Sequence, residues 1–224
     1  MVGSKFGPSR KNLKPRYLML VFAKLSCFFF ILCGPLGSAT TLLKLDIDQV
    51  AKEAELVFEG EVLTHEVRAE ARTGLINTYV TFSILDVIKG DSQATTIELK
   101  FAGGTINGET TKVNGLTIPE SGERGIYFVE STSENLINPL VGWSQGHFLI
   151  KEIDGESIIY TTSHKPVIDV QSVSSIPPSI KRPKSTLEEN SDVAAGVLVD
   201  KEEQIRRQRL KVNELKSEIL EMIR

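Results

Sequence analysis

The stretch "EAELVFEGEV", Glu53 to Val62, changes its hydrophobic period halfway through. Before it, "DIDQVAKEAE" places apolar residues at helical spacing, with Asp46 as a candidate N-cap. From Leu56 onward the apolar residues alternate, as they do along a strand with one buried face. Gly60 stands within that strand, where a glycine commonly marks a bulge or a sharp bend. We therefore expect a short helix that leads directly into a bent first strand.

Further strand signals follow at short intervals. They are the alternating runs "LINTYVTFSILDVIKGD", "TTIELKF", "GIYFVES" and "HFLIKEIDGESIIYTT". The last run reads as a hairpin, with Asp154 and Gly155 as its two-residue turn. Several short strands with one preceding helix favour a mainly β fold, a small sandwich or barrel. We assign this β domain to residues 40–165.

The composition changes after Lys165. Residues 166–197 are rich in serine and proline and are expected to form a linker or a surface strap. Residues 198–224 are expected to form an amphipathic helix. Its apolar stripe consists of Ile205, Val212, Leu215, Ile219, Met222 and Ile223. We favour a helix that docks on its own β domain, while the seven-residue spacing from Leu198 leaves open a coiled-coil seam and thus an oligomer.

The first 39 residues have the order of a secretory signal peptide. Basic residues come first, an apolar run follows from Tyr17 to Cys33, and small residues lead up to Ala39. Cleavage after Ala39 would export the chain to a periplasm or to the medium. The alternative is an uncleaved membrane anchor at residues 17–33, a run near the short limit for a span.

Cysteine use and charge narrow the class of protein further. Both cysteines, Cys27 and Cys33, lie within the leader, so a chain beginning at Thr40 has no disulfide; this fits a bacterial exported protein better than a eukaryotic one. The leader also carries six of the 26 basic residues, which leaves 20 against 29 acidic residues and a net charge of −9. An acidic chain of this kind argues against a nucleic-acid partner.

Two motifs carry a resemblance to a known family. The run "AELVFEGEV", followed by "YVTFSILDVIKG", resembles the netrin-like modules, to which the tissue inhibitors of metalloproteinases belong. Ala54 and Glu55 correspond to the Ala-Asp pair at the start of the first strand of those modules. Lys89 and Gly90 correspond to the Lys-Gly turn that ends their second strand. The chain also resembles exported bacterial proteins with a Gly-x-x-Gln-Gly-x-Phe segment, here Gly142 to Phe148.

The netrin-like resemblance implies an OB-type fold, a small closed barrel of five strands with a bent first strand. Such a barrel would bind a protein or an oligosaccharide on the face of its second and third strands. The inhibitors place an N-terminal cysteine on the zinc of a protease, whereas a chain beginning at Thr40 has no thiol there. The resemblance therefore carries the fold to this chain, and not the inhibitory contact.

A serine-hydrolase motif offers a rival function. "GWSQG" matches the Gly-x-Ser-x-Gly nucleophile elbow at Ser144, and Asp154 and His164 follow in the order of that class. The elbow requires a helix after the serine, but "HFLIKEI" alternates as a strand. We therefore favour a turn that enters a strand.

The remaining candidate residues are few. Trp143, the only tryptophan, is either a surface anchor for a partner or a core residue, and Gln145 beside it is a second candidate contact. The three histidines, His65, His147 and His164, show no metal-binding spacing, and His65 is expected on a solvated strand face. The sequence predicts no metal and no cofactor. It favours a non-catalytic, exported binding module whose ligand is a protein, an exported protease among the options, with an oligosaccharide as the alternative.

Overall fold

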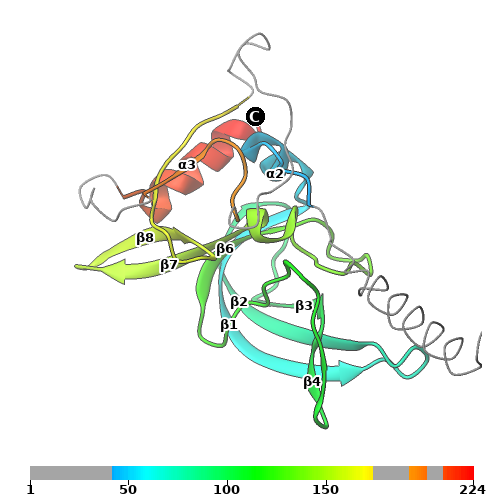
Figure 1. Cartoon of the computed structure of the whole chain (residues 1–224). Helices are drawn as coiled ribbons and strands as arrows, with labels where there is room; N and C mark the ends of the chain where they lie inside the picture. Colours follow the sequence, from blue (N-terminus) through cyan, green and yellow to red (C-terminus); the bar gives the residue numbers. More distant parts are fainter. Residues whose placement is uncertain (1–41, 174–191, 201–208) are drawn as a thin grey trace, which may run out of the picture. The chain divides into compact units, whose positions relative to one another are not determined.

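The computed structural model describes residues 42–173, 192–200 and 209–224, and the predicted leader lies outside them. The fold is mainly β, as predicted (Figure 1). Its elements are α2 (Ile47–Glu53), β1 (Leu56–Ala69), β2 (Ile76–Lys89), β3 (Thr96–Ala102), β4 (Gly104–Ile106), β5 (Glu109–Thr111), β6 (Arg124–Val129), the 3₁₀ turn η1 (Trp143–Gly146), β7 (His147–Ile153), β8 (Glu156–Thr161), β9 (Val167–Val170), β10 (Val197–Val199) and α3 (Val212–Met222). None of the helices in these ranges is long and apolar enough to cross a membrane.

The main sheet is antiparallel and open. Its six strands run in the order β3-β2-β1-β6-β7-β8, while β9 with β10 and β4 with β5 form two small ribbons. The prediction of a closed five-stranded barrel is therefore wrong. The sheet stays open because its two edge strands, β3 and β8, do not pair with each other. The outer edge of β8 is covered instead by later segments, since Ile159 N–H donates to Leu210 O and Thr161 N–H to Lys165 O, each at 2.9 Å.

The first strand is bent at the predicted glycine. The pairing of β1 with β2 shifts register between Glu59 and Gly60 and again between Val62 and Thr64. A Cβ atom on Gly60 would lie 2.6 Å from a ring carbon of Phe58 and 2.8 Å from the carbonyl oxygen of Ser83. Only glycine fits so close to a ring and a backbone, which explains its place within the strand.

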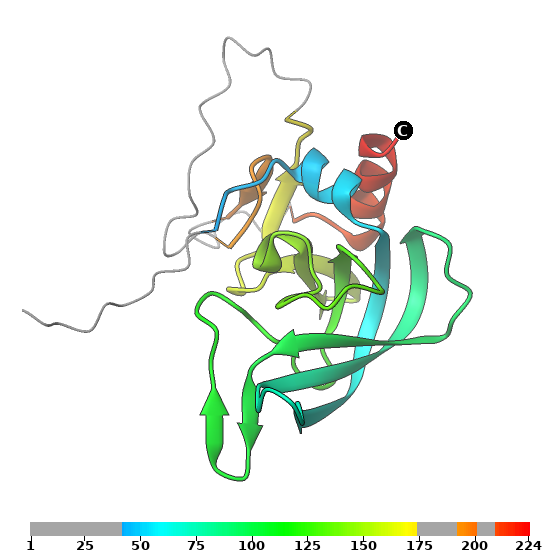
Figure 2. The ribbon, with the colours of Figure 1, turned by 90° about the vertical axis from the view of Figure 1, so that its right-hand side faces the viewer.

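Two large hydrophobic cores lie on the two faces of this sheet, and a third, small cluster is formed by Leu149, Ile158 and Tyr160 of β7 and β8. On one face α2, α3, β9 and β10 cover the strands β6, β7 and β8; we call this the helix-covered core. Figure 1 shows α2 and α3 side by side over these strands. On the other face, β1, β2 and β3 curl around Phe58, Phe82 and Tyr127; we call this the curled core. Figure 2 shows this curl, with the β4–β5 hairpin extending from it.

Lys89 joins the end of β2 to the end of α2. Its ammonium donates to the carbonyl oxygens of Ala51, Lys52 and Ala54 at 2.9, 2.8 and 2.5 Å. These carbonyls end the helix without partners in it, and a cation there also favours the helix dipole. Burial lowers the pKa of Lys89. The Lys-Gly turn that carries part of the netrin-like resemblance thus has a structural role in this chain.

The C-terminal helix is shorter than predicted. It begins at Val212. Leu198, which was predicted to belong to it, lies in β10 and pairs with Asp169 of β9. Ile205 falls outside the described residues. The strap predicted at 166–197 accordingly contains β9 and the first residue of β10. Docking on the β domain is confirmed, since Leu215 and Ile219 are fully buried in the helix-covered core. Lys216 adds an ion pair of 2.5 Å to Glu59 of β1.

Candidate functional site

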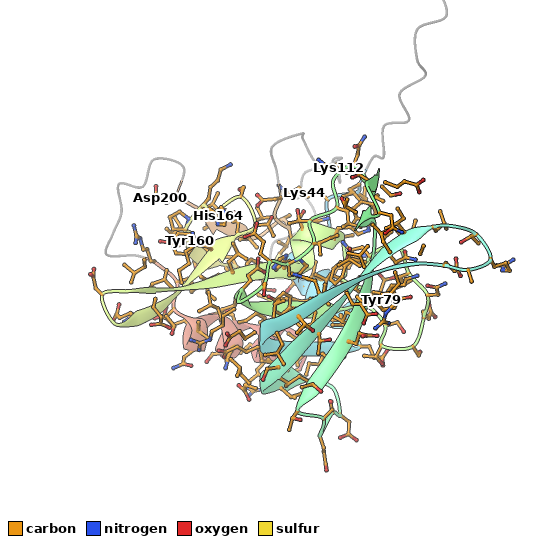
Figure 3. The ribbon with its side chains drawn as sticks, turned by 90° about the horizontal axis from the view of Figure 1, so that it is seen from below. Lys44, Tyr79, Lys112, Tyr160, His164 and Asp200 are labelled. Atoms are coloured by element: carbon orange, nitrogen blue, oxygen red, sulfur yellow. The ribbon has the colours of Figure 1, made fainter. Side chains whose placement is uncertain are left out.

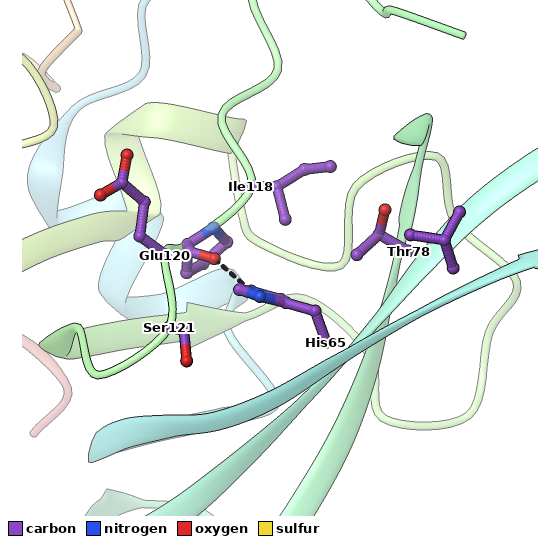
Figure 4. A pocket seen from close by; sticks show the side chains of 7 residues that line it. His65, Thr78, Ile118, Glu120 and Ser121 are labelled. Carbon is purple, nitrogen blue, oxygen red and sulfur yellow. Dashed lines mark hydrogen bonds between the residues drawn. The ribbon is translucent and has the colours of Figure 1, made fainter. Parts of the chain in front are cut away.

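A pocket opens on the inner face of the curled strands. It has a volume of about 380 Å³. Its lining consists of His65 and Val67 from β1, Thr78 from β2, and Ile118, Pro119, Glu120 and Ser121 from the loop before β6 (Figure 4). The walls are mostly apolar, with a few hydroxyl, imidazole and carboxylate groups. Pockets that bind ligands commonly have this composition.

A β-bulge places His65 in this pocket. Val62 pairs with Phe82, but one extra residue, Leu63, puts His65 opposite Val80. Phe82 and Val80 share the inner face, so the bulge turns His65 onto that face as well. His65 is exposed, as expected of a solvated residue, but it lies on the face of Val80 and Phe82 and not on the polar face of its strand. Strict alternation, on which the predicted face depended, fails after the bulge.

Two hydrogen bonds fix the polar groups of the pocket. Nε2 of His65 lies 2.7 Å from the carbonyl oxygen of Pro119 (Figure 4). Because a carbonyl can only accept, Nε2 is the donor, and Nδ1 of the neutral ring is left as an acceptor. The hydroxyl of Thr78 donates to Gly103 O at 2.8 Å. The loop and β1 are thus tied together across the pocket.

The partly buried carboxylate of Glu123 fixes the loop that lines the pocket. Glu123 accepts hydrogen bonds from His147 Nε2 at 2.7 Å, from the Tyr127 hydroxyl at 3.1 Å and from the Glu120 amide at 3.2 Å. Burial opposes its charge, but these hydrogen bonds outweigh burial, so the pKa of Glu123 lies below its usual value. The network connects the core residues Tyr127 and His147 to Glu120, which lines the pocket.

His147 is the most deeply buried member of this network. Its side chain is 1% exposed, and within the described residues its Nδ1 has no hydrogen-bond partner. Because a carboxylate can only accept, Nε2 of His147 is the donor to Glu123. A buried ring nitrogen without a partner costs stability, so Nδ1 is a local cost of this network.

The "GWSQG" segment forms η1 rather than a nucleophile elbow. Gln145 is fully buried; its side chain accepts from Leu45 N–H at 2.8 Å and donates to Leu43 O at 3.0 Å. It holds the segment before α2 against η1, and a partner cannot reach it in this structure. Trp143 is half-buried, so it is neither a fully exposed anchor nor a core residue. Its backbone has a positive φ of 61°.

The structure does not bring Ser144 and Asp154 together. Ser144 precedes β7 and Asp154 follows it, so the extended strand separates them by roughly 23 Å. His164 lies in the turn after β8, exposed and with a positive φ of 62°. Within the described residues, no hydrogen bond joins the side chains of these three residues. A catalytic triad requires such bonds from serine to histidine and from histidine to aspartate.

Within the described ranges there is also no group of three or more His, Cys, Asp or Glu side chains that could hold a metal ion. No protein-family model matches the chain, and no curated protein or solved structure matches it significantly. The pocket beside His65 is thus the best-defined candidate site.

Proposed function

We propose that the chain is a non-catalytic binding module for a protein, and that the pocket beside His65 receives one side chain of that protein. The observation that carries this proposal is the pocket itself. Apolar walls and a few polar atoms meet there on a rigid frame of two paired strands and a loop held by Glu123. Binding sites placed on rigid elements lose little conformational entropy when they are occupied.

The size of the pocket favours a side chain over an oligosaccharide. A volume of about 380 Å³ is at the low end of the range for ligand pockets. Val67, Ile118 and Pro119 offer an apolar contact suited to an aliphatic or aromatic group. His65, Thr78 and Ser121 can fix its orientation through hydrogen bonds. An oligosaccharide remains the alternative, and the test below includes it.

The choice of a protein partner also rests on the resemblance to netrin-like modules and on the signal-peptide order of the leader. Together they favour a partner in a periplasm or the medium, with an exported protease as the first class to examine. Such a contact would differ from that of the metalloproteinase inhibitors, because a chain from Thr40 offers no N-terminal thiol to a zinc ion.

A pocket-filling variant tests this function. Ser121 lies exposed at the pocket, so Ser121→Trp should fill it with little effect on stability. The matched control is Ser133→Trp, in an exposed loop outside the lining. Pull-down from native periplasm or medium should capture a protein with wild type and with the control. Capture of that protein should fall roughly tenfold or more with Ser121→Trp.

Three outcomes would contradict the proposal. Equal capture by all three proteins would place the binding surface elsewhere. Glycan-array binding that is lost in Ser121→Trp, with no captured protein, would favour the oligosaccharide alternative. Stoichiometric labelling by a fluorophosphonate probe, lost in Ser144→Ala, would identify a serine hydrolase instead.

A further inference from the structure

A second surface, outside the pocket, gathers apolar and cationic side chains from distant parts of the chain. We define the Trp143 surface by Leu42, Leu43, Lys44, Lys112 and Trp143. Leu43 is 50% exposed, and Leu42 and Trp143 are half-buried. Leu42 and Trp143 both lie beside Gly115, at 3.8 and 3.9 Å from the position that a Cβ would take there. Three segments therefore meet at this surface.

The surface is held in place by the backbone. Trp143 has a left-handed backbone, which a bulky residue adopts only where its surroundings impose it. Its N–H donates to Leu140 O at 3.0 Å. Buried Gln145 ties the segment from Leu43 to Leu45 against η1. The leucines and the tryptophan are thus presented together rather than on independent loops.

Two lysines lie close in sequence to these segments. Lys44 lies between Leu43 and Leu45, and Lys112 lies three residues before Gly115. Figure 3 shows both lysines on the same side of the molecule. Neither forms an ion pair with a carboxylate in the described part of the chain. Their charges remain available to an anionic surface, although the chain from Thr40 is acidic overall.

The chain that leads to this surface indicates what covers it. Eight residues, 34–41, separate the apolar run from Tyr17 to Cys33 from Leu42. Those residues can span at most roughly 30 Å. If the run is held in a bilayer, the Trp143 surface is therefore within reach of the same bilayer. Tryptophan is enriched at the membrane interface, leucine enters the acyl region, and lysine attracts anionic headgroups.

We propose that the Trp143 surface docks on a lipid bilayer with anionic headgroups. Leu43 and Trp143 enter the interface, and Lys44 and Lys112 contact headgroup phosphates. The inference rests on the alternative in which the leader is not cleaved, and the Trp143 surface shares no residue with the pocket proposed above.

The single tryptophan makes this inference directly measurable. The full chain is added to vesicles of phosphatidylcholine and phosphatidylglycerol, with and without bromine on the acyl chains. Bromine quenches only a tryptophan that it contacts, so Trp143 emission should shift to shorter wavelength and be quenched. Replacing both lysines, Lys44→Glu with Lys112→Glu, should lower the docked-to-undocked ratio by roughly fivefold or more for each lysine. Leu43→Ser should also reduce quenching.

The matched control is Leu75→Ser, at a leucine that is 58% exposed in the turn between β1 and β2. It should leave the quenching at the wild-type level, and circular dichroism should show that all variants remain folded. Absence of quenching in the wild-type chain would overturn the inference, whether or not the leader binds the vesicles. Equal quenching of wild type, the lysine variant and Leu43→Ser would overturn it as well. So would a Trp143 signal that changes only when a protein partner is added.

Discussion

The two halves of the main sheet have the same antiparallel ladder but different covers. Over β6, β7 and β8 lie two helices and the β9–β10 ribbon, which together leave a continuous buried core. Over β1, β2 and β3 lies the loop that carries Leu116 and Ile118. A helix closes a sheet face with a row of side chains, whereas a loop covers it only in part. The pocket therefore lies in the curled half, beside that loop.

The halves are nevertheless joined through two strands, β1 and β6. Val57 of β1 belongs to the helix-covered core, and its neighbour Phe58 belongs to the curled core. The same division occurs in β6, between Phe128 and Tyr127. Since successive residues of a strand point to opposite faces, β1 and β6 are buried on both sides. We expect the two halves to unfold together.

The largest effect is expected from Leu215→Ala in α3. Leu215 is fully buried in the helix-covered core, so the substitution should lower the free energy of unfolding by about 2–5 kcal/mol. Because β1 is shared, thermal unfolding followed by near-ultraviolet circular dichroism should show one transition at a lower temperature. The control is Leu220→Ala on the exposed side of the same helix, with an expected change within about 0.5 kcal/mol.

Two results would contradict the expectation that the two halves unfold together. If the curled half keeps its wild-type hydrogen-exchange protection while α3 loses its own, the halves are separate cooperative units. If light scattering shows only a change in oligomer mass, α3 is an assembly element, as the coiled-coil alternative would require.

A smaller effect is expected from Gln145→Ala. The substitution leaves Leu45 N–H and Leu43 O without their side-chain partner, which should cost about 1–3 kcal/mol in urea unfolding. Hydrogen exchange at Leu45 should rise more than exchange within β2. An unchanged midpoint would mean that water replaces the amide and that Gln145 does not fix the Trp143 surface.

The smallest effect concerns pH and the curled half. The folded pKa of Glu123 lies below its ordinary value of 4.5, so its stabilising contribution is complete above that value. The contribution is lost as the pH falls through the folded pKa. Glu123→Gln should therefore lower stability at neutral pH and give a shallower acid limb in urea titrations. Parallel acid limbs for the two proteins would show that the network from His147 to Glu120 does not depend on this charge.

Local sequence patterns predicted much of the fold. The change of period at Leu56 located α2 and β1, and the turn at Asp154 and Gly155 located the hairpin of β7 and β8. Both signals concern residues close in sequence. Closure of the sheet depends instead on whether β3 meets a distant strand, and alternation contains no information about that pairing. The closed barrel was therefore the part of the fold prediction that failed.

The candidate site could be predicted less well for a related reason. A single extra residue, Leu63, moves His65 to the other face, and no residue type in "EVLTHEV" marks it as a bulge. Glu123 and His147 are 24 residues apart and meet only because β6 pairs with β7. The sequence identified Trp143 and Gln145 as candidate contact residues. It could not show that Gln145 is buried and Trp143 half-buried, because burial depends on the tertiary structure.

The close fit at Gly60 has a consequence for how this chain can change through evolution. The space that a Cβ would need there is occupied by the ring of Phe58, from the same strand, and by the backbone of Ser83. A larger residue at position 60 becomes acceptable only after position 58 has lost its ring and the strands have moved apart. A smaller residue at 58, in turn, opens a void in the curled core that glycine cannot fill. We therefore expect positions 58 and 60 to covary: homologues that change one of them should also change the other.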